Sequence, residues 1–152
     1  MALLAADERR PAAMTIPMEY RQASADFDRF ILDVRDIAGL QTTNQAYTMV
    51  QAVLQTFRRR LDVPDALLFA NVLPPVLRAL FVADWDMEEP QMPFAGRFAM
   101  TREVQSLRPD HNLSPDTAIA DVAAALRRNI DELTLDRVLA RLPAGATDFW
   151  RA

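Results

Sequence analysis

The chain has 152 residues, of which 51% are hydrophobic, so it is long enough to bury a substantial core and is not a disordered segment. Its net charge of −4 is small and mixed in sign, which argues against a dedicated nucleic-acid surface. All 17 basic residues are arginine and there is no cysteine, which excludes disulfides, thiolate nucleophiles, cysteine-held metals and lysine Schiff bases.

Residues 1–22 contain Pro11 and Pro17 and no sustained hydrophobic period, which predicts a flexible N-terminal leader. The apolar stretch at 2–6 is followed at once by charged residues, whereas a signal peptide needs a longer apolar core. No run approaches the roughly 18 apolar residues of a membrane-spanning helix. We therefore expect a cytoplasmic protein that does not enter the membrane.

Apolar residues recur at helical spacing after Ser24. We expect Ser24 to cap a first helix that ends at Gly39. Thr42 and Gln45 have the spacing of a capping box, which predicts a longer second helix over residues 43–61. Two shorter helices are expected to follow, and the prolines that open them are Pro64 and Pro75.

An acidic segment with two prolines, residues 84–97, predicts a linker in the middle of the chain. Beyond it, Thr101, Ser114 and Thr134 each precede an apolar helical stripe, and we expect each of them to cap a helix. The longest of these helices is expected over about residues 115–132.

The two halves of the sequence, about residues 23–85 and 98–152, repeat one another. Aligning Thr42 with Ser114 brings the apolar positions of the two long helices into register, and a shorter loop in the second half then aligns Leu73-Pro74 with Leu142-Pro143. The matched apolar pairs in the long helices are Ala46 with Ala118, Val50 with Val122, Leu54 with Leu126 and Leu61 with Leu133.

One half alone has too little apolar area to be stable, so we expect the halves to bury their stripes against each other. The sequence therefore predicts a single all-α domain over residues 23–152, a compact helical bundle of about seven or eight helices built from two tandem pseudo-repeats. Burial of Val50, Leu54, Val122 and Leu126 is the central expectation of this interpretation.

The order of these motifs resembles a known family, the bacterial domain of unknown function 2267, over roughly residues 20–152. The resemblance rests mainly on positions in the core and at helix ends, and it implies tandem helical halves without implying a particular reaction or ligand. The motifs that carry it are Phe27-x-x-Phe30, Ala38-Gly39-Leu40, Ala70-x-x-Leu73-Pro74, Arg102-Glu103-Val104, Asp110-His111-Asn112 and Ala140-Arg141-Leu142-Pro143.

Two groups of polar residues are candidates for chemistry. His111, beside Asp110, is a candidate pH-sensitive group or general base, but no nucleophile elbow accompanies it, so a structural role in its loop is favoured. The acids of the linker, including Asp84 and Asp86, lack the glycine turn of a calcium loop, which favours a solvated linker. We therefore predict no catalytic, cofactor-binding or metal-binding residue.

Arginines and tryptophans offer the other candidate sites. The cluster Arg58, Arg59 and Arg60 at the end of the second helix is explained by the helix dipole and by solvation, and its alternative role is binding of phosphate or an acidic partner. Trp85 and Trp150 are expected to cover helix junctions, with an exposed interface anchor as the alternative for the region around Trp85.

These observations leave three functional hypotheses. The first is a non-enzymatic helical protein-interaction module that binds another protein or a second copy of itself. The second is a binder of a small anionic ligand, or an enzyme, that uses a cleft between the halves, and the third is nucleic-acid binding through the arginine cluster. The expected interaction surface comprises Arg58, Arg59, Arg60, Asp84, Trp85, Asp86 and His111.

Overall fold

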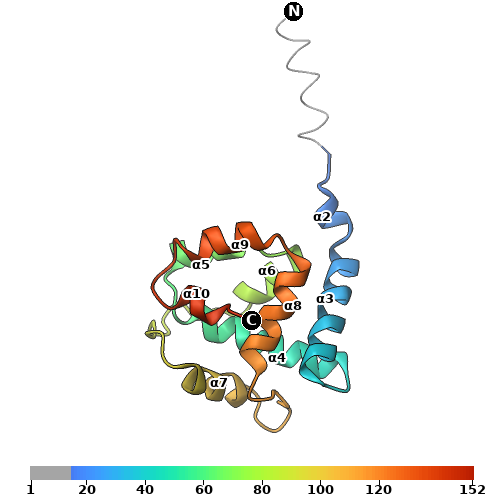
Figure 1. Ribbon diagram of the computed structural model, residues 1–152. Helices are drawn as coiled ribbons and strands as arrows, with labels where there is room; N and C mark the ends of the chain where they lie inside the picture. Colours follow the sequence, from blue (N-terminus) through green and yellow to red (C-terminus); the bar gives the residue numbers. More distant parts are fainter. Residues whose placement is uncertain (1–14) are drawn as a thin grey trace, which may run out of the picture.

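The computed structural model describes residues 15–152, and every regular element in that range is an α-helix, as expected (Figure 1). Among these residues no helix combines the length and the apolar character needed to cross a membrane. The helices are α2 (Met18–Arg21), α3 (Ala23–Ala38), α4 (Thr43–Arg58), α5 (Val63–Ala70), α6 (Pro75–Val82), α7 (Arg97–Ser106), α8 (Ala118–Asn129), α9 (Glu132–Leu139) and α10 (Ala146–Phe149).

The junction between α3 and α4 follows its sequence signals. Gly39 ends α3 with a left-handed backbone, φ 68°, which a glycine adopts without strain. The Thr42 side chain accepts a hydrogen bond from the backbone N–H of Gln45, and the Gln45 side chain accepts one from the backbone N–H of Thr42, so the capping box is confirmed.

Other expected caps were wrong. Ser24 lies inside α3, which begins at Ala23, and the hydroxyls of Thr101 and Thr134 also lie within their helices. Thr101 donates to the carbonyl of Arg97, 2.7 Å away, while Thr134 donates to the side chain of Asp131, 2.6 Å away. Asp131 is the residue that caps α9. A serine or threonine hydroxyl can cap a helix, or it can donate a hydrogen bond to a group three or four residues earlier. A serine or threonine before an apolar stripe therefore does not by itself identify the first residue of a helix.

Ser114 also fails to cap α8, which begins at Ala118 after a tight turn closed by a hydrogen bond from Ala118 N–H to the Pro115 carbonyl. The Ser114 hydroxyl is buried and has no hydrogen-bond partner. Asn112 holds this loop instead, because its amide donates to the carbonyls of Val104 and Leu107 at the end of α7, each 2.8 Å away.

The last residues of the expected leader, 1–22, are helical in the structure. Its residues 1–14 lie outside the described range, but α2 occupies Met18–Arg21 within it and leads directly into α3 (Figure 1). Arg78 of α6 contacts this short helix through the Tyr20 hydroxyl, 3.4 Å away, and through the Glu19 carboxylate, 3.8 Å away.

Helices from the two parts of the chain pack across each other. α3 lies against α8 as well as α4, α4 lies against α6, α7 and α8, and α5 lies beside α9, as Figure 1 shows at the top of the molecule. Val50, Leu54, Val122 and Leu126 are each at most 2% exposed, so the central expectation of mutual burial is confirmed. Apolar burial of this kind contributes most of the stability available to such a chain.

Five aromatic side chains from four helices and their ends form the centre of the core. Phe57 of α4 packs against Phe69 of α5 and Phe149 of α10, with ring centroids 4.7 and 4.9 Å apart. Phe69 also packs against Phe81 and stacks on Trp150, which is fully buried. The aromatic ends of the two halves therefore share one core, as expected for Trp150.

One aligned pair was wrong. Leu61 is buried, whereas Leu133 is 65% exposed. Asp62 and Asp131 cap α5 and α9, and an alignment on these two caps pairs Leu61 with Ile130 instead of Leu133.

Candidate functional site

The three consecutive arginines at the end of α4 occupy different environments. Arg58 and Arg60 are each only 3% exposed, which contradicts the expectation of a solvated cluster. Because successive residues at a helix end point in different directions, Arg58 and Arg60 reach separate parts of the interior while Arg59 lies between them near the surface. Only Arg60 returns to its own helix, where it donates to the Thr56 carbonyl, 2.8 Å away.

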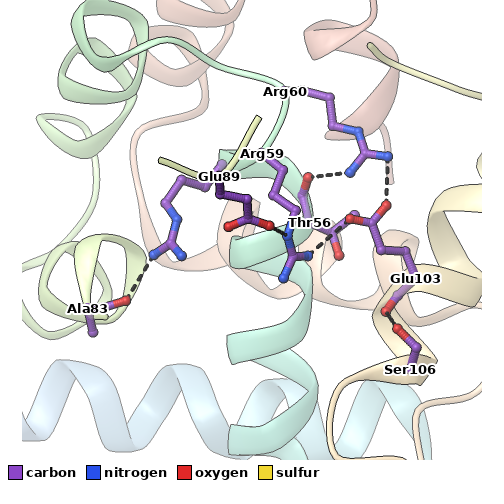
Figure 2. A network of polar contacts seen from close by, with 8 residues as sticks. Thr56, Arg59, Arg60, Ala83, Glu89, Glu103 and Ser106 are labelled. Carbon is purple, nitrogen blue, oxygen red and sulfur yellow. Dashed lines mark hydrogen bonds and ion pairs between the residues drawn. The ribbon is translucent and has the colours of Figure 1, made fainter. Parts of the chain in front are cut away.

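Two of these arginines form an ion-pair network, drawn in Figure 2. Arg59 lies between the carboxylates of Glu89 and Glu103, at 2.7 and 3.0 Å. Arg60 contacts the other oxygen of Glu103 at 2.7 Å. Since Glu103 belongs to α7 and Glu89 to the linker, this network fastens the end of α4 to the linker and to the second half of the chain.

Arg58 has a different set of partners. Its Nη1 donates to the carbonyls of Phe81 and Ala83, each 2.9 Å away, and so ties the end of α4 to the end of α6. Its guanidinium lies over the ring of Trp85, 5.3 Å from the ring centre, in a cation–π contact. Its Nε is buried without a partner, and within residues 15–152 Arg58 forms no ion pair.

The surroundings of Arg58 disfavour its charge. Burial lowers the pKa of Arg58, and the neighbouring cation Arg59 lowers it further, while the more distant carboxylates of Glu89 and Asp84 raise it. An arginine stays protonated even so, since its ordinary pKa lies far above neutral pH. Arg58 is therefore a buried cation without a direct counterion.

A pocket of about 210 Å³ opens beside this cation, between the end of α4, the start of α5 and the linker. Its lining combines charged and apolar side chains, and the half-buried Trp85 forms part of it. The lining residues are Arg58, Arg59, Leu61, Asp62, Val63, Trp85, Met87, Glu89, Pro90 and Gln91. We call this space the Arg58 pocket.

The remaining residues of the expected surface do not line the Arg58 pocket. Arg60 is buried against Glu103, and Asp84 is exposed with a left-handed backbone, φ 53°. Asp86 is exposed and accepts a hydrogen bond from the backbone N–H of Glu88, 2.9 Å away. His111 is exposed in the loop between α7 and α8, where its backbone N–H donates to the Arg108 carbonyl. The structure thus brings together Arg58, Arg59 and Trp85, and leaves the others apart.

Sequence reasoning missed the polar partners that shape this site. Glu89 and Glu103 lie 30 and 44 residues from Arg59, and Gln91 donates to the Arg60 carbonyl from 31 residues away. The presence of both an acidic linker and an arginine cluster in the sequence indicates that ion pairs could form between them. It does not indicate which arginine remains without an ion pair.

The other long helix provides a reference for Arg58. Arg127, near the end of α8, donates to the carbonyl of Trp150, 2.9 Å away, much as Arg58 donates to the carbonyl of Phe81. Arg127 also pairs with Glu132 at 3.5 Å and with Asp136 at 3.0 Å. Each arginine thus holds a backbone carbonyl at the end of its own half, Arg127 through Nε and Arg58 through Nη1, but within residues 15–152 only Arg127 has carboxylate partners.

Comparison with known proteins places the chain in a family. Residues 27–149 match the family described as an uncharacterized conserved protein, DUF2267, so the chain belongs to this family. This match confirms the resemblance inferred from the helix-end and core motifs. No curated protein matches the chain.

Proposed function

We propose that this chain is a non-catalytic binding protein whose Arg58 pocket receives an anionic group. The observation that carries the proposal is the state of Arg58, which is buried, lines an open pocket and pairs with no carboxylate of residues 15–152. This is a form of the anion-binding hypothesis in which the site lies at the end of α4 and the linker rather than in a cleft between the halves.

Electrostatics supports an anion at this position. A buried cation without a counterion is costly, and two carbonyl acceptors and a tryptophan ring offset only part of that cost. An oxyanion in the pocket would supply a charge-assisted hydrogen bond to a guanidinium that is already held in place. Because Arg58 is fixed by Phe81, Ala83 and Trp85, little side-chain entropy remains to be lost on binding.

The test is a titration of the full chain with small anions, acetate and inorganic phosphate, followed through amide chemical shifts. We expect saturable shifts at Val63 and Met87, which line the pocket. Arg58→Gln should reduce affinity at least about tenfold, whereas the matched control Arg127→Gln should leave it unchanged. Shifts that stay linear with concentration, or that survive Arg58→Gln, would contradict the proposal.

A second candidate function, the protein-interaction module, is favoured by one other observation. Phe98 on α7 is 74% exposed, and Arg102 lies over its ring, 5.0 Å from the ring centre. Aromatic and arginine side chains of this kind are enriched where proteins bind each other. Sedimentation across a range of protein concentrations tests self-association, which Phe98→Ala should weaken if this surface is used.

Nucleic-acid binding through the arginine cluster receives less support, because Arg58 and Arg60 are buried and Arg59 is already paired with two carboxylates. Bacterial origin, cytoplasmic location and an internal repeat remain predictions from the sequence. The repeat is supported by the way α3 meets α8 while α4 meets α7, which is the pairing that a pseudo-twofold axis would produce.

A further inference from the structure

The charges around the Arg58 pocket limit the anion that it can hold. Arg59 also lines the pocket, but Glu89 and Glu103 already neutralise it at 2.7 and 3.0 Å. Asp62 adds one more carboxylate to the lining, which already contains Glu89. Among the described residues, Arg58 is the lining arginine that forms no ion pair, and a ligand with more than one negative charge would be repelled by these acids.

The rest of the lining is apolar. Leu61, Val63, Met87 and Pro90 join the face of Trp85 around the space next to the guanidinium. A volume of about 210 Å³ suits a small branched or flat apolar group rather than a nucleotide or a sugar phosphate. An oxyanion that reaches Arg58 would thus bring its apolar part against these side chains.

Arg127 in the second half of the chain provides a comparison for Arg58. Arg58 precedes the cap Asp62 by the same separation as Arg127 precedes the cap Asp131, and the helices that follow, α5 and α9, have the same length. The two arginines are therefore equivalent when the halves are aligned on these caps.

This alignment identifies what replaces the counterions of Arg127. Glu132, the first residue of α9, corresponds to Val63, the first residue of α5. Asp136, one turn later, corresponds to Leu67. Both carboxylates that neutralise Arg127 are thus exchanged for apolar residues in the first half; Val63 lines the Arg58 pocket, and Leu67 lies outside it and is 53% exposed.

From this exchange we infer that the Arg58 pocket binds a single carboxylate attached to a small apolar group, the chemistry of a short monocarboxylic acid or of the C-terminal residue of a peptide. Nη1 of Arg58 is held by the carbonyls of Phe81 and Ala83 and its Nε is buried, so the carboxylate accepts from Nη2, the nitrogen that Asp136 contacts in Arg127. The apolar group covers Val63 and Trp85. This inference rests on the proposed function and specifies the ligand class of the same site.

The experiment titrates the full chain with isovalerate, with isovaleramide, and with inorganic phosphate, and follows the amide shifts of the pocket residues. We expect isovalerate to bind with a dissociation constant in roughly the high-micromolar to millimolar range, and at least about tenfold more tightly than its amide or phosphate. Equal or tighter binding of phosphate would overturn the monocarboxylate inference and leave the anion-binding function standing. Saturable binding of none of these probes would overturn both.

A second arm separates the two sources of the carboxylate. The tripeptide Ala-Ala-Leu is titrated with a free and with an amidated C-terminus. If a peptide terminus is the natural ligand, the free peptide binds more tightly than isovalerate and the amidated one does not bind. If a free acid is the ligand, isovalerate binds more tightly than either peptide.

Two substitutions make the result independent of damage to the fold. Val63→Glu restores at Arg58 the carboxylate that Arg127 has, and an acid is favourable in the first turn of a helix, so the chain should remain folded and lose isovalerate binding at least about tenfold. Asp62→Asn keeps the side-chain cap of α5 and removes one rim charge, so phosphate binding should strengthen. Unchanged isovalerate affinity in a folded Val63→Glu variant would contradict the inference.

Discussion

At the scale of single residues, Arg60 and Glu103 form a contact that the chain depends on for stability. The side chain of Arg60 is 2% exposed and its only carboxylate partner in the described part of the chain is Glu103. Glu103→Gln should lower the free energy of unfolding by about 3 kcal/mol, because it leaves a buried cation unpaired. Urea unfolding measures this loss.

A matched control for that substitution is Asp148→Asn. Asp148 pairs with Arg151 at 2.9 Å, but both side chains are at least 70% exposed. Such a surface pair contributes less than about 1 kcal/mol. Equal losses in the two variants would show that the network around Arg60 is no stronger than a surface ion pair.

Asp131 gives a residue-scale prediction for pH. The hydroxyl of Thr134, then the backbone N–H of Leu133, hold the pKa of Asp131 below its ordinary value. A lowered folded-state pKa stabilises the fold above the unfolded pKa of about 3.9 and loses that contribution as pH falls through the folded value. Asp131→Ala should therefore be less stable than the original chain at neutral pH, and the gap should narrow below about pH 4. A gap that is constant from neutral to acidic pH would contradict this assignment.

The sequence could predict that Arg58, Arg59 and Trp85 belong to one interaction surface, but not how the charges of the two arginines are satisfied. Each of the three lies where a helix ends or a linker begins, which is where such surfaces are expected. The burial of Arg58 depends on the end of α6 returning to the end of α4, and no local pattern encodes that return. His111 has suitable chemistry for such a surface, but it lies in a different loop, between α7 and α8.

At the scale of elements, Gly145 controls how α10 approaches the linker. Its φ is 104°, and an added Cβ would lie 2.6 Å from Cγ of Phe94, too close for any real contact. Gly145→Ala should cost more than about 2 kcal/mol of stability from backbone strain and collision. At Gly96 the backbone is ordinary and nothing lies within 4 Å of an added Cβ, so Gly96→Ala should be close to neutral by thermal unfolding.

The corrected register of α9 gives a second prediction at this scale. Leu135 is fully buried, whereas Leu133 is 65% exposed. Leu135→Ala should cost about 2–5 kcal/mol and Leu133→Ala well under 1 kcal/mol. The sequence alignment, which puts Leu133 on a buried stripe as well, would require a comparable loss for Leu133→Ala in a urea titration of the two variants.

Element existence and type were predictable because apolar residues recur at helical spacing from Phe27 to Leu139, and the long stripes are the strongest such signal. Helix starts were less predictable. Thr42 caps α4 as predicted because Gln45 completes a reciprocal pair of hydrogen bonds. Ser114 and Thr134 have no such partner three residues later. α8 begins without a side-chain cap, and Asp131 caps α9 in place of Thr134.

At the scale of the whole molecule, the two halves act as one folding unit in this account. α4, which carries Arg58, packs against α3, α6, α7 and α8. The pocket is therefore held in shape partly by helices from the other half of the chain. A destabilising substitution in α8 should therefore lower the local stability of α4 as much as that of α8.

Native-state hydrogen exchange on Leu126→Ala tests this claim most directly. Leu126 is 1% exposed in α8, and its truncation should cost about 2–5 kcal/mol. If the halves stabilise one another, the slowest amides of α4 and of α8 lose protection by the same free energy. If α4 keeps its original protection while α8 loses it, each half is stable by itself and the account is contradicted.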